Sequence, residues 1–365
     1  RIVEAIKVIG GTNIQFAHDP KSGRVVVIEI NPRTSRSSAL ASKATGFPIA
    51  LISAKLAAGL TLDEIPYWKE GSLEKYRPSG DYVVVKFPRW AFEKFRGAKD
   101  VLGTQMKAVG EAMSIGKTYK EAFQKSIRSL ENGRYGLGFA KDFNSRSLDD
   151  LMMLLKEPSS ERQFILYEAI RKGADIQKLY QLTHIKPWFL QQMKELVELE
   201  EEILAYKGKP LADLPDDLLE RAKKDGFADR YLSKLLAVSE AEIRARRKSQ
   251  GIVQGWEAVP VSGVENAFYY YSTYNAPDKT TSSNRRKVMV LGGGPNRIGQ
   301  GIEFDYCCVH AAFALRDMGI ETIMVNCNPE TVSTDYDTSD KLYFEPLTVE
   351  DVLSIYEKEK PDGVI

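Results

Sequence analysis

The segment KVMVLGGGPNRIGQG, residues 287–301, decides the fold of the last part of the chain. Its first five residues predict a buried strand, and the glycine-rich loop after them leads into a helix that ends near Gly319. A second strand at Glu321–Asn326 and a second helix at Val349–Lys358 follow. Because consecutive strand–helix–strand units place their strands side by side in one direction, residues 283–365 are predicted to form a partial parallel α/β domain.

Residues 134–282 follow a different pattern, that of successive short amphipathic helices. Helical spacing of apolar residues covers about 159–173, 187–206, 216–225 and 239–250. Ser147 and Ser239, each followed three residues later by an acidic residue, mark two helix starts. No strand is predicted before Phe268, and residues 275–284 have the composition of a linker. The middle of the chain is therefore predicted to be an all-α domain.

Residues 1–133 mix strands and helices. Two strands at Asn13–Ala17 and Arg24–Ile30, joined by a turn at Asp19–Gly23, predict a hairpin. Further elements are predicted as helices from about 37 to 60 with a break near Gly46, a strand at 81–87 and a helix at 118–130 that begins with a capping box. The chain is therefore expected to be multidomain: a partial α+β domain, an all-α domain and a partial parallel α/β domain.

Composition narrows the classes of function. Hydrophobic residues make up 43% of the chain and charged residues 28%, as in ordinary globular proteins. The net charge of +1 gives no overall field that favours nucleic acid or an anionic membrane, and no apolar run is long enough to span a bilayer. Three cysteines and three scattered histidines argue against a disulfide framework or a zinc centre. We therefore expect a cytoplasmic location and, if a metal binds, a hard cation held by oxygen atoms.

Five polar side chains in and after the predicted hairpin form the first candidate site: Gln15, Glu29, Asn31, Arg33 and Arg36. Glu29, Asn31 and Arg33 alternate along one strand and its exit, and a period of two places them on one face. Oxygens of Glu29 and Asn31 suit Mg²⁺ or Mn²⁺, and Gln15 on the paired strand can supply a third. Arg33 and Arg36 can hold an oxyanion through paired hydrogen bonds. The set predicts a site for metal and nucleotide phosphates, and a solvated polar strand face is the alternative.

The segment VIEINPRTSRSSALA, residues 27–41, resembles the end of the ATP-grasp domain in the first half of the carbamoyl phosphate synthetase large chain. In that family the divalent metals that bridge ATP are bound at the positions matching Gln15, Glu29 and Asn31. The bicarbonate and carboxyphosphate end of the site contains the positions matching Arg33 and Arg36. The resemblance therefore implies the same roles for these five residues here.

The glycine-rich loop after residue 291 is the second candidate site, because backbone amides at the start of a helix can hold an anion. It is not a Walker A loop, since no Gly-Lys-Ser or Gly-Lys-Thr follows. Its glycines lack the spacing of a dinucleotide site, and the next strand ends in Asn326 and Asn328 instead of an acidic ribose ligand. A tight strand-to-helix turn is the alternative. Cys307 and Cys308 in the following helix are predicted to be small buried residues, not nucleophiles.

The run from Gly292 to Cys308 resembles the opening of the second half of the same large chain, in the Rossmann-like domain that precedes its second ATP-grasp fold. Val325–Asp337 continues the resemblance. In that family the position matching Gly301 adjoins the ammonia and carbamate tunnel, and the tunnel also passes near the position matching Ala39. A small side chain at Ala39 would leave that passage open, and ordinary helix packing is the alternative explanation for it.

The region between these two resemblances corresponds to the part that the family uses for oligomerisation. The implied division is residues 1–133 as the C-terminal part of the first ATP-grasp domain, 134–282 as a helical oligomerisation domain and 283–365 as the truncated start of the second pre-ATP-grasp domain. Two charged clusters, Glu195–Glu202 and Arg244–Lys248, are predicted to be solvated helix faces, with a salt-bridged subunit contact as the alternative.

The resemblance covers nearly the whole chain and implies an internal fragment of the large chain. Arg1–Val3 contains no Met and Gly363–Ile365 reads as the start of a strand, so we expect both ends to lie inside domains. The implied full enzyme makes carbamoyl phosphate from bicarbonate, glutamine-derived ammonia and two ATP, for pyrimidine and arginine biosynthesis. Its implied cofactors are ATP, Mg²⁺ or Mn²⁺, and K⁺. Its implied partners are a glutamine amidotransferase small subunit and further copies of the same chain.

Two other functions stay open at this stage. The fragment by itself is expected to be inactive and to act as an oligomerisation module without nucleotide binding, because the nucleotide-binding lid is not in the sequence. A different ATP-grasp ligase, such as a biotin-dependent carboxylase, shares the Glu-x-Asn-x-Arg strand. Such ligases lack a helical domain followed by a second glycine-loop domain, which disfavours them.

Overall fold

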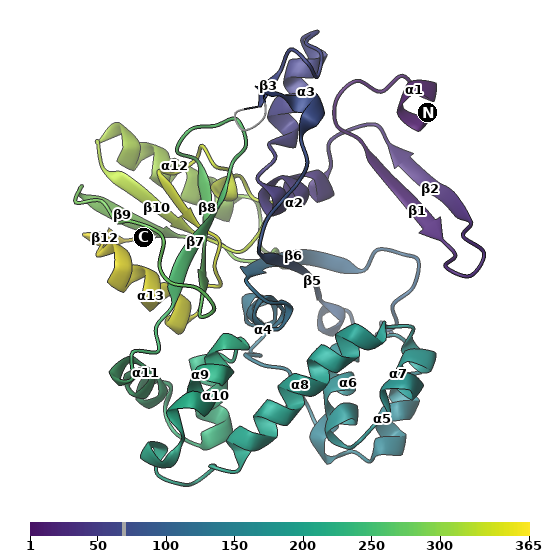
Figure 1. Ribbon diagram of the computed structural model, residues 1–365, viewed down its shortest axis with the longest axis vertical. Helices are drawn as coiled ribbons and strands as arrows, with labels where there is room; N and C mark the ends of the chain where they lie inside the picture. The colour runs from purple at the N-terminus through teal and green to yellow at the C-terminus, as the bar shows by residue number, and fades with distance from the viewer. Residues whose placement is uncertain (68–70) are drawn as a thin grey trace.

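A six-stranded sheet forms the framework of the C-terminal part of this computed structural model, which describes residues 1–67 and 71–365 (Figure 1). The strand order is β12-β9-β10-β11-β8-β7, and all neighbours are parallel except the antiparallel pair β7 and β8. The strands are β7 (Gly255–Pro260), β8 (Phe268–Thr273), β9 (Lys287–Leu291), β10 (Glu321–Val325), β11 (Lys341–Tyr343) and β12 (Gly363–Val364). Alternate side chains of β9 pack on Ala312 of α12 (Glu303–Asp317) and on Ile355 of α13 (Val349–Glu359), so the two helices cover opposite faces.

The predicted parallel α/β unit is confirmed, but the sheet is larger than the sequence indicated. It takes in β7 and β8, which precede the boundary expected at residue 283. The expectation of no strand before Phe268 is wrong, because β7 begins at Gly255. The sequence of β7 does not alternate between apolar and polar residues, because the strand is buried on both faces through Gly255, Trp256 and Glu257.

The middle of the chain is helical, as predicted, and has one large apolar core. Its helices are α5 (Leu148–Leu154), α6 (Arg162–Arg171), α7 (Ile176–Thr183), α8 (Pro187–Leu204), α9 (Asp216–Lys224), α10 (Asp229–Leu236) and α11 (Glu240–Ser249). Both predicted caps are confirmed: Ser147 Oγ accepts from the Asp150 amide at 3.1 Å, and Ser239 Oγ accepts from the Glu242 amide at 3.2 Å. Short 3₁₀ turns lie at Phe143–Ser145 and Leu211–Asp213.

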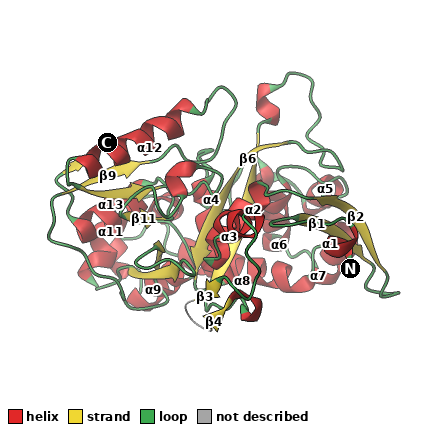
Figure 2. Ribbon diagram, turned by 90° about the horizontal axis from the view of Figure 1, so that it is seen from above, coloured by secondary structure: helices red, strands yellow, loops and turns green. Residues whose placement is uncertain are grey.

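The N-terminal part contains two separate two-stranded sheets, besides a very short pair, and four helices. Its elements are α1 (Ile2–Ala5), β1 (Asn13–His18), β2 (Val25–Asn31), α2 (Arg36–Thr45), α3 (Ile49–Ala57), β3 (Pro66–Tyr67), β4 (Gly71–Ser72), β5 (Val83–Trp90), β6 (Ala108–Gly116) and α4 (Tyr119–Ser129). The predicted hairpin is the pair β1–β2, which projects away from the rest at one side of the molecule, opposite α12 (Figures 1 and 2). Strand β6 was not predicted; it pairs with β5, and α4 packs on both.

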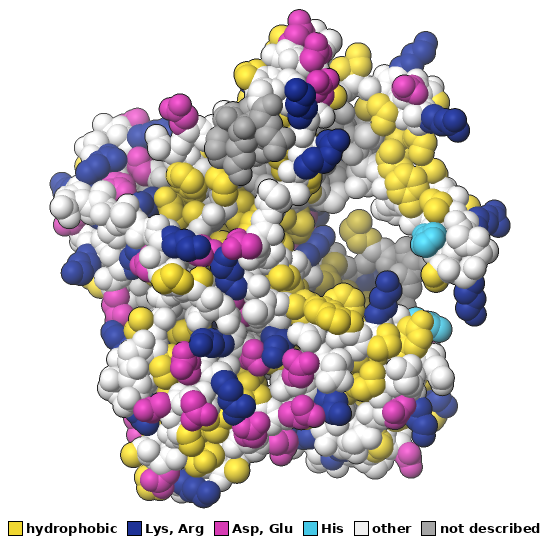
Figure 3. All heavy atoms as spheres, viewed as in Figure 1, with side chains coloured by type: hydrophobic (Ala, Val, Ile, Leu, Met, Phe, Trp, Pro, Cys, Tyr) yellow, Lys and Arg dark blue, Asp and Glu magenta, His cyan; other side chains and the backbone are white. Residues whose placement is uncertain are grey.

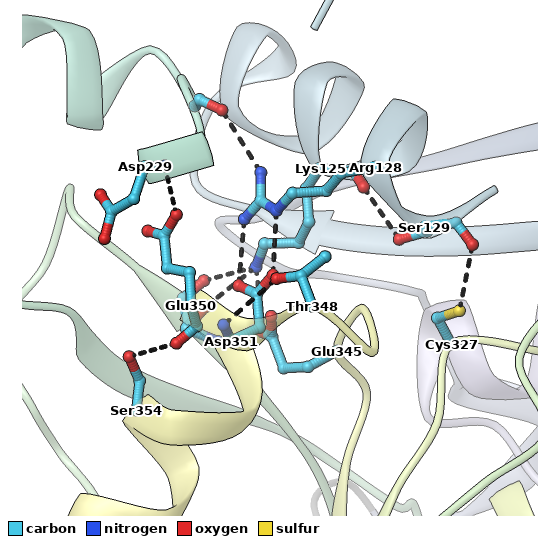
Figure 4. A network of polar contacts seen from close by, with 12 residues as sticks. Lys125, Arg128, Ser129, Asp229, Cys327, Glu345, Thr348, Glu350, Asp351 and Ser354 are labelled. Atoms are coloured by element: carbon cyan, nitrogen blue, oxygen red, sulfur yellow. Dashed lines mark hydrogen bonds and ion pairs between the residues drawn. The ribbon is translucent and has the colours of Figure 1, made fainter. Parts of the chain in front are cut away.

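A group of buried charged side chains joins α4, the helical region and the sheet region (Figure 4). We call it the ionic junction, and its members are Lys125, Arg128, Lys223, Asp229, Arg247, Glu345, Glu350 and Asp351. Arg128 Nε lies 3.0 Å from Asp351 Oδ2, and Lys223 Nζ lies 2.7 Å from Glu350 Oε1. No member is more than 6% exposed, so these charges depend on one another for compensation.

Candidate functional site

The hairpin brings together the three predicted oxygen ligands. Gln15 of β1 lies directly opposite Glu29 of β2, next to a β-bulge between Gln15 and Phe16. Asn31 lies two residues beyond Glu29 on the same face, and its Nδ2 donates to Glu29 Oε1 at 3.2 Å. Side chains of Gln15, Glu29 and Asn31 therefore project from one face of the hairpin, as their spacing predicted.

The oxygen donors on this face fit a hard divalent cation that is also bound by ligands from outside the protein. It consists of one carboxylate and two amide oxygens, and Glu29 is exposed. In residues 1–67 and 71–365 no group of three or more His, Cys, Asp or Glu is arranged to hold a metal, so an all-protein carboxylate cage is not formed there. Mg²⁺ commonly binds through one or two carboxylates and completes its shell with water and phosphate oxygens. The three side chains suit that mode of binding.

The two arginines predicted to bind an anion, Arg33 and Arg36, have different contacts in the structure. Arg33 is exposed, and its Nη1 donates only to the neighbouring Thr34 carbonyl, at 3.3 Å. Arg36 is the first residue of α2, which Ser35 caps through a reciprocal pair of hydrogen bonds with Ser38. Its Nε lies 3.8 Å from Glu330 Oε1, a residue of the C-terminal region. Arg36 therefore reaches across to the second predicted constellation, which sequence reasoning did not foresee.

Glu330 belongs to a small polar cluster with Arg36, Lys86 and Glu111. Lys86 of β5 forms an ion pair with Glu111 of β6. Burial raises the pKa of the Glu330 carboxyl, and the negative charge of Glu111 adds to this, whereas Arg36 and Lys86 oppose it. Sequence analysis missed Lys86, Glu111 and Glu330, and the available signal for Glu330 was its position just after the Asn-rich end of the second predicted strand.

Ala39 lines a cavity of about 350 Å³ between α2, α3 and residues 335–337. The neighbouring Lys43 is buried beside it, with Nζ 2.7 Å from Thr334 Oγ1 and 3.1 Å from Asp335 Oδ1. Gly301 is exposed in the loop before α12, and a methyl group there would meet the side chain of Glu303. Ala39 therefore borders open space instead of serving only in helix packing.

Hydrogen bonds join the glycine-rich loop to the end of the neighbouring strand, β10. The Gly292 amide donates to the Val325 carbonyl at 2.8 Å, and the Gly294 amide donates to Asn326 Oδ1 at 3.1 Å. Asn328 Nδ2 donates to the Gly294 carbonyl at 3.0 Å. Gly294 has a φ of 67°, which favours glycine. The amides of Gly292 and Gly294 are therefore satisfied within the chain, as the tight-turn alternative expects.

Comparison with known proteins decides the family. Three family models match successive segments: the carbamoyl-phosphate synthase L chain ATP binding domain at residues 1–65, the large-chain oligomerisation domain at 111–251 and the preATP-grasp domain at 284–365. The chain belongs to the carbamoyl phosphate synthase large-chain family.

Curated relatives in this family are similar along the whole chain. The carbamoyl phosphate synthase large chain of Archaeoglobus fulgidus is 54% identical over 374 residues, which covers 99% of this chain and 35% of the relative. The large chain of Synechocystis sp. is 54% identical and matches 98% of this chain and 33% of its own length. The arginine-specific chloroplastic large chain of Arabidopsis thaliana is 50% identical, with 98% and 30% covered. The chain thus spans about a third of the length of the large chains that it matches.

Family membership confirms the predicted resemblance and the mixed α/β and all-α architecture. The oligomerisation-domain match begins at residue 111, so it includes the end of β6 and α4 in addition to the helices expected from 134. No helix in the described part of this large-chain segment is long and apolar enough to cross a bilayer.

The charged clusters of the large-chain helical region are solvated only in part, since Glu198, Glu201 and Glu202 are exposed as predicted. Glu200 is fully buried and accepts hydrogen bonds from Tyr167 and Tyr231 at 2.6 and 2.9 Å. Arg247 is buried in the ionic junction, whereas Arg244 and Lys248 pair with Glu357 of α13. The prediction of solvated faces is wrong for Glu200 and Arg247, which are buried and have polar or charged partners elsewhere in the same chain.

One cysteine prediction is also wrong. Cys327 is fully buried and Cys308 is half-buried, but Cys307 is exposed on α12. Cys307 lies on the outer side of α12, next to Tyr306, which is 60% exposed. A helix that covers a sheet buries only one side, so adjacent residues need not share an environment.

Proposed function

We propose that this sequence serves, within a longer large chain, in the ATP-dependent synthesis of carbamoyl phosphate from bicarbonate and ammonia. The observation that carries the proposal is the common face of Gln15, Glu29 and Asn31, inside the segment that matches an ATP binding domain. The relatives of that name support the reaction. Because the chain spans about a third of their length, the activity is proposed for the whole protein and not for this segment alone.

In this proposal Glu29, Asn31 and Gln15 hold Mg²⁺ or Mn²⁺, and that cation neutralises the phosphate charge of ATP. Glu29 contributes one negative charge, whereas the two amides add oxygen ligands without charge, which leaves the site attractive to polyphosphate. Arg33, whose guanidinium has no ion-pair partner in residues 1–67 and 71–365, binds the bicarbonate-derived oxyanion. Arg36, held near Glu330, positions the same end of the site against the C-terminal region.

The metal assignment is tested by Mn²⁺ binding followed by electron paramagnetic resonance. Glu29→Gln is expected to lower Mn²⁺ affinity by about tenfold or more, because it removes the sole charged ligand. Glu4→Gln, a change at another exposed carboxylate, should leave binding unchanged. In the full-length large chain, Glu29→Ala should abolish bicarbonate-dependent ATP hydrolysis. Near-normal hydrolysis by that variant would contradict the proposal.

We also propose that Ala39 and Gly301 border a passage for ammonia or carbamate. The cavity beside Ala39 supports this assignment for one end of the passage. In the full-length enzyme, Gly301→Phe should leave ATP cleavage running while carbamoyl phosphate formation falls. Unchanged coupling between the two would refute the passage.

A second candidate function is that of an oligomerisation module without nucleotide binding. It is favoured by the complete apolar core of the helical region and by the hairpin, whose strands are exposed on both faces. Light scattering on the purified chain and its titration with ATP in the presence of Mg²⁺ distinguish this function from that of a nucleotide-binding segment. A defined oligomer without ATP binding supports the module, and tight ATP binding supports a complete nucleotide site.

Several further parts of the proposal follow the family. We propose the division into residues 1–133, 134–282 and 283–365, although β7 and β8 of the middle segment add their strands to the sheet of the last one. A glutamine amidotransferase small subunit as partner, K⁺ as an additional cofactor, service to pyrimidine or arginine biosynthesis and a cytoplasmic location belong to the same proposal for the whole enzyme. Mass spectrometry of the native complex would test the partner.

A further inference from the structure

A cavity of about 300 Å³ lies between the loop 133–140 and α10, far along the chain from the hairpin. Its lining includes three cationic side chains, Arg134, Arg230 and Lys234, and no Asp or Glu among the described residues that line it. A concave surface lined by charge of one sign concentrates ions of the other sign. The cavity is therefore suited to an anion.

Two of these cations are held in place by aromatic rings and form no ion pair with any described residue, although the Glu240 carboxylate lies near enough to Arg230 for their charges to interact. Arg230 and Lys234 lie four residues apart on α10, so they share one face of the helix. The Arg230 guanidinium lies 4.6 Å from the ring centroid of Tyr135, and Lys234 Nζ lies 6.0 Å from that of Phe139. Throughout residues 1–67 and 71–365, neither side chain has a hydrogen-bond acceptor or an ion-pair partner. The aromatic rings orient these charges and leave their polar atoms free.

Arg134 is a contrasting cation in the same wall. It pairs with Glu161 at 2.7 Å and stacks on Phe164, with 4.1 Å to the ring centroid. Its charge is therefore already compensated, and the free positive charge of the cavity comes from Arg230 and Lys234.

The loop adds unsatisfied backbone donors to the same wall. Gly138 donates its amide to Tyr231 Oη at 2.9 Å, and Phe139 donates its amide to Glu168 Oε1 at 2.7 Å. Within the described part of the chain, the amides of Tyr135 and Gly136, two residues that line the cavity, have no acceptor. Gly136 is a buried residue, and a buried amide without a partner is uncommon unless a ligand or water accepts from it.

The loop is built to stay in this position. A Cβ atom at Gly136 would lie 2.5 Å from the Tyr231 ring, and one at Gly138 would lie 2.6 Å from Tyr231 Oη, so only glycine allows the close approach. Phe139 has a φ of 56°, a strained conformation for a non-glycine residue that the surrounding contacts maintain. Free amides in such a fixed loop resemble the backbone concavities that bind anions in other folds.

We propose that this cavity binds the phosphoryl group of a small phosphate compound, with Arg230, Lys234 and the loop amides as its donors. Two free amides beside two cations without ion pairs in the described part of the chain match the several oxygens of a phosphoryl group better than the two of a carboxylate. The volume exceeds the needs of a phosphate ion and falls at the lower end of small-molecule sites, so it leaves room for an attached sugar. The site shares no residue with the metal face of the hairpin.

The test is isothermal titration calorimetry of the whole chain with inorganic phosphate, ribose 5-phosphate and adenosine 5′-monophosphate. We expect binding of at least one of the three, weakened by about tenfold or more in the double variant Arg230→Gln/Lys234→Gln. Lys178→Gln, a change at an exposed lysine of α7 outside the cavity, is the matched control and should bind as the parent does. Lys234→Arg should retain binding.

Each possible result of the calorimetry tests a separate part of the proposal. Stronger binding of the two esters than of phosphate would identify a phosphate ester as the ligand, and equal binding would identify inorganic phosphate. Binding that is lost equally in the Lys178→Gln variant would overturn the site, because it would reflect net charge alone. Absence of binding of all three compounds at millimolar concentration would also overturn it. Circular dichroism of each variant verifies that the helical region stays folded.

Discussion

The hairpin β1–β2 and the ionic junction both carry charged and polar side chains, but in opposite surroundings. Phe16 and Ile28 of the hairpin are 53% and 63% exposed, and Figure 3 shows apolar side chains gathered on this part of the surface. Lys223 and Asp229 of the junction are 1% and 0% exposed. Glu29 on the hairpin contacts only a neutral amide, whereas Glu350 in the junction contacts a lysine.

This difference separates groups that stabilise the fold from groups that are free to bind. A buried charge must be compensated by the chain itself, and each charged side chain of the junction has an oppositely charged partner. An exposed carboxylate with no cation beside it costs little in the folded state and keeps its affinity for a ligand. Pairing and burial therefore predict which polar residues tolerate substitution without unfolding.

The largest effect is expected from Lys223→Met. This substitution removes one of the two cations that the buried carboxylates of Asp229 and Glu350 share, the other being Arg247, and it should lower the free energy of unfolding by about 3–5 kcal/mol. The adjacent Lys224 pairs with Glu220 on the surface, so Lys224→Met should cost about 1 kcal/mol or less. Urea denaturation followed by circular dichroism measures both. Equal losses would show that the junction is not a special contributor to stability.

A pH dependence is the next largest effect. Burial opposes ionisation of Glu350, but the charges of Lys223, Arg128 and Arg247 outweigh it and hold the pKa of this carboxyl at about 2. Because the folded-state pKa is below the usual 4.5, the stabilisation is fully present above about pH 4.5 and is lost as the pH falls toward 2. The difference corresponds to about 3 kcal/mol.

Glu350→Gln should therefore reduce the slope of unfolding free energy against pH in this acidic range. Denaturation at a series of pH values from 5 to 2 measures the slope. A parental slope in Glu350→Gln would contradict the assignment.

A smaller effect should distinguish buried from exposed apolar residues. Ile127 of α4 is fully buried, so Ile127→Val should cost about 1 kcal/mol through loss of one methylene group from the core. Ile28 is 63% exposed, so Ile28→Val should change stability by less than about 0.5 kcal/mol. Thermal unfolding of the two variants side by side provides the measurement, and a greater loss for Ile28→Val would show that the hairpin is packed in solution.

The smallest effect on stability is expected from Glu29→Gln, within about 0.5 kcal/mol of the parent. Glu29 has no ion pair in the described residues and lies on an exposed strand. Combined with the predicted loss of Mn²⁺ binding, an unchanged midpoint of unfolding would separate a ligand role from a structural one. A large loss of stability would place Glu29 with the residues of the junction instead.

The local sequence pattern was sufficient to predict much of the fold. The hairpin, α2 and α3, the capped helices and the order β9–α12–β10–α13 all follow from spacing and punctuation within short windows. Strand β11 escaped prediction because three residues, Lys341–Tyr343, are too few to show a period. Strand β6 escaped because Ala and Gly are poor markers of a strand and its second half is buried on both faces.

The residues of the candidate site also divide into those that the local sequence pattern predicts and those that it does not. Gln15, Glu29 and Asn31 could be placed together because two strands joined by a short turn fix their register. The contact of Arg36 with Glu330 could not, because it joins residues from opposite ends of the chain through tertiary packing. The same reason explains why Glu200 and Arg247 were mistaken for solvated residues, since their partners come from other helices.

The ionic junction has a practical consequence for dissection of the chain. Its cations come from α4 and the helical region, whereas Glu345, Glu350 and Asp351 come from the segment after the linker at 275–284. A shorter polypeptide ending at that linker would retain Arg128 and Lys223 but lack Asp351 and Glu350. It would have to hydrate these cations by opening its own core, so the helical region and the sheet region are better expressed as one piece.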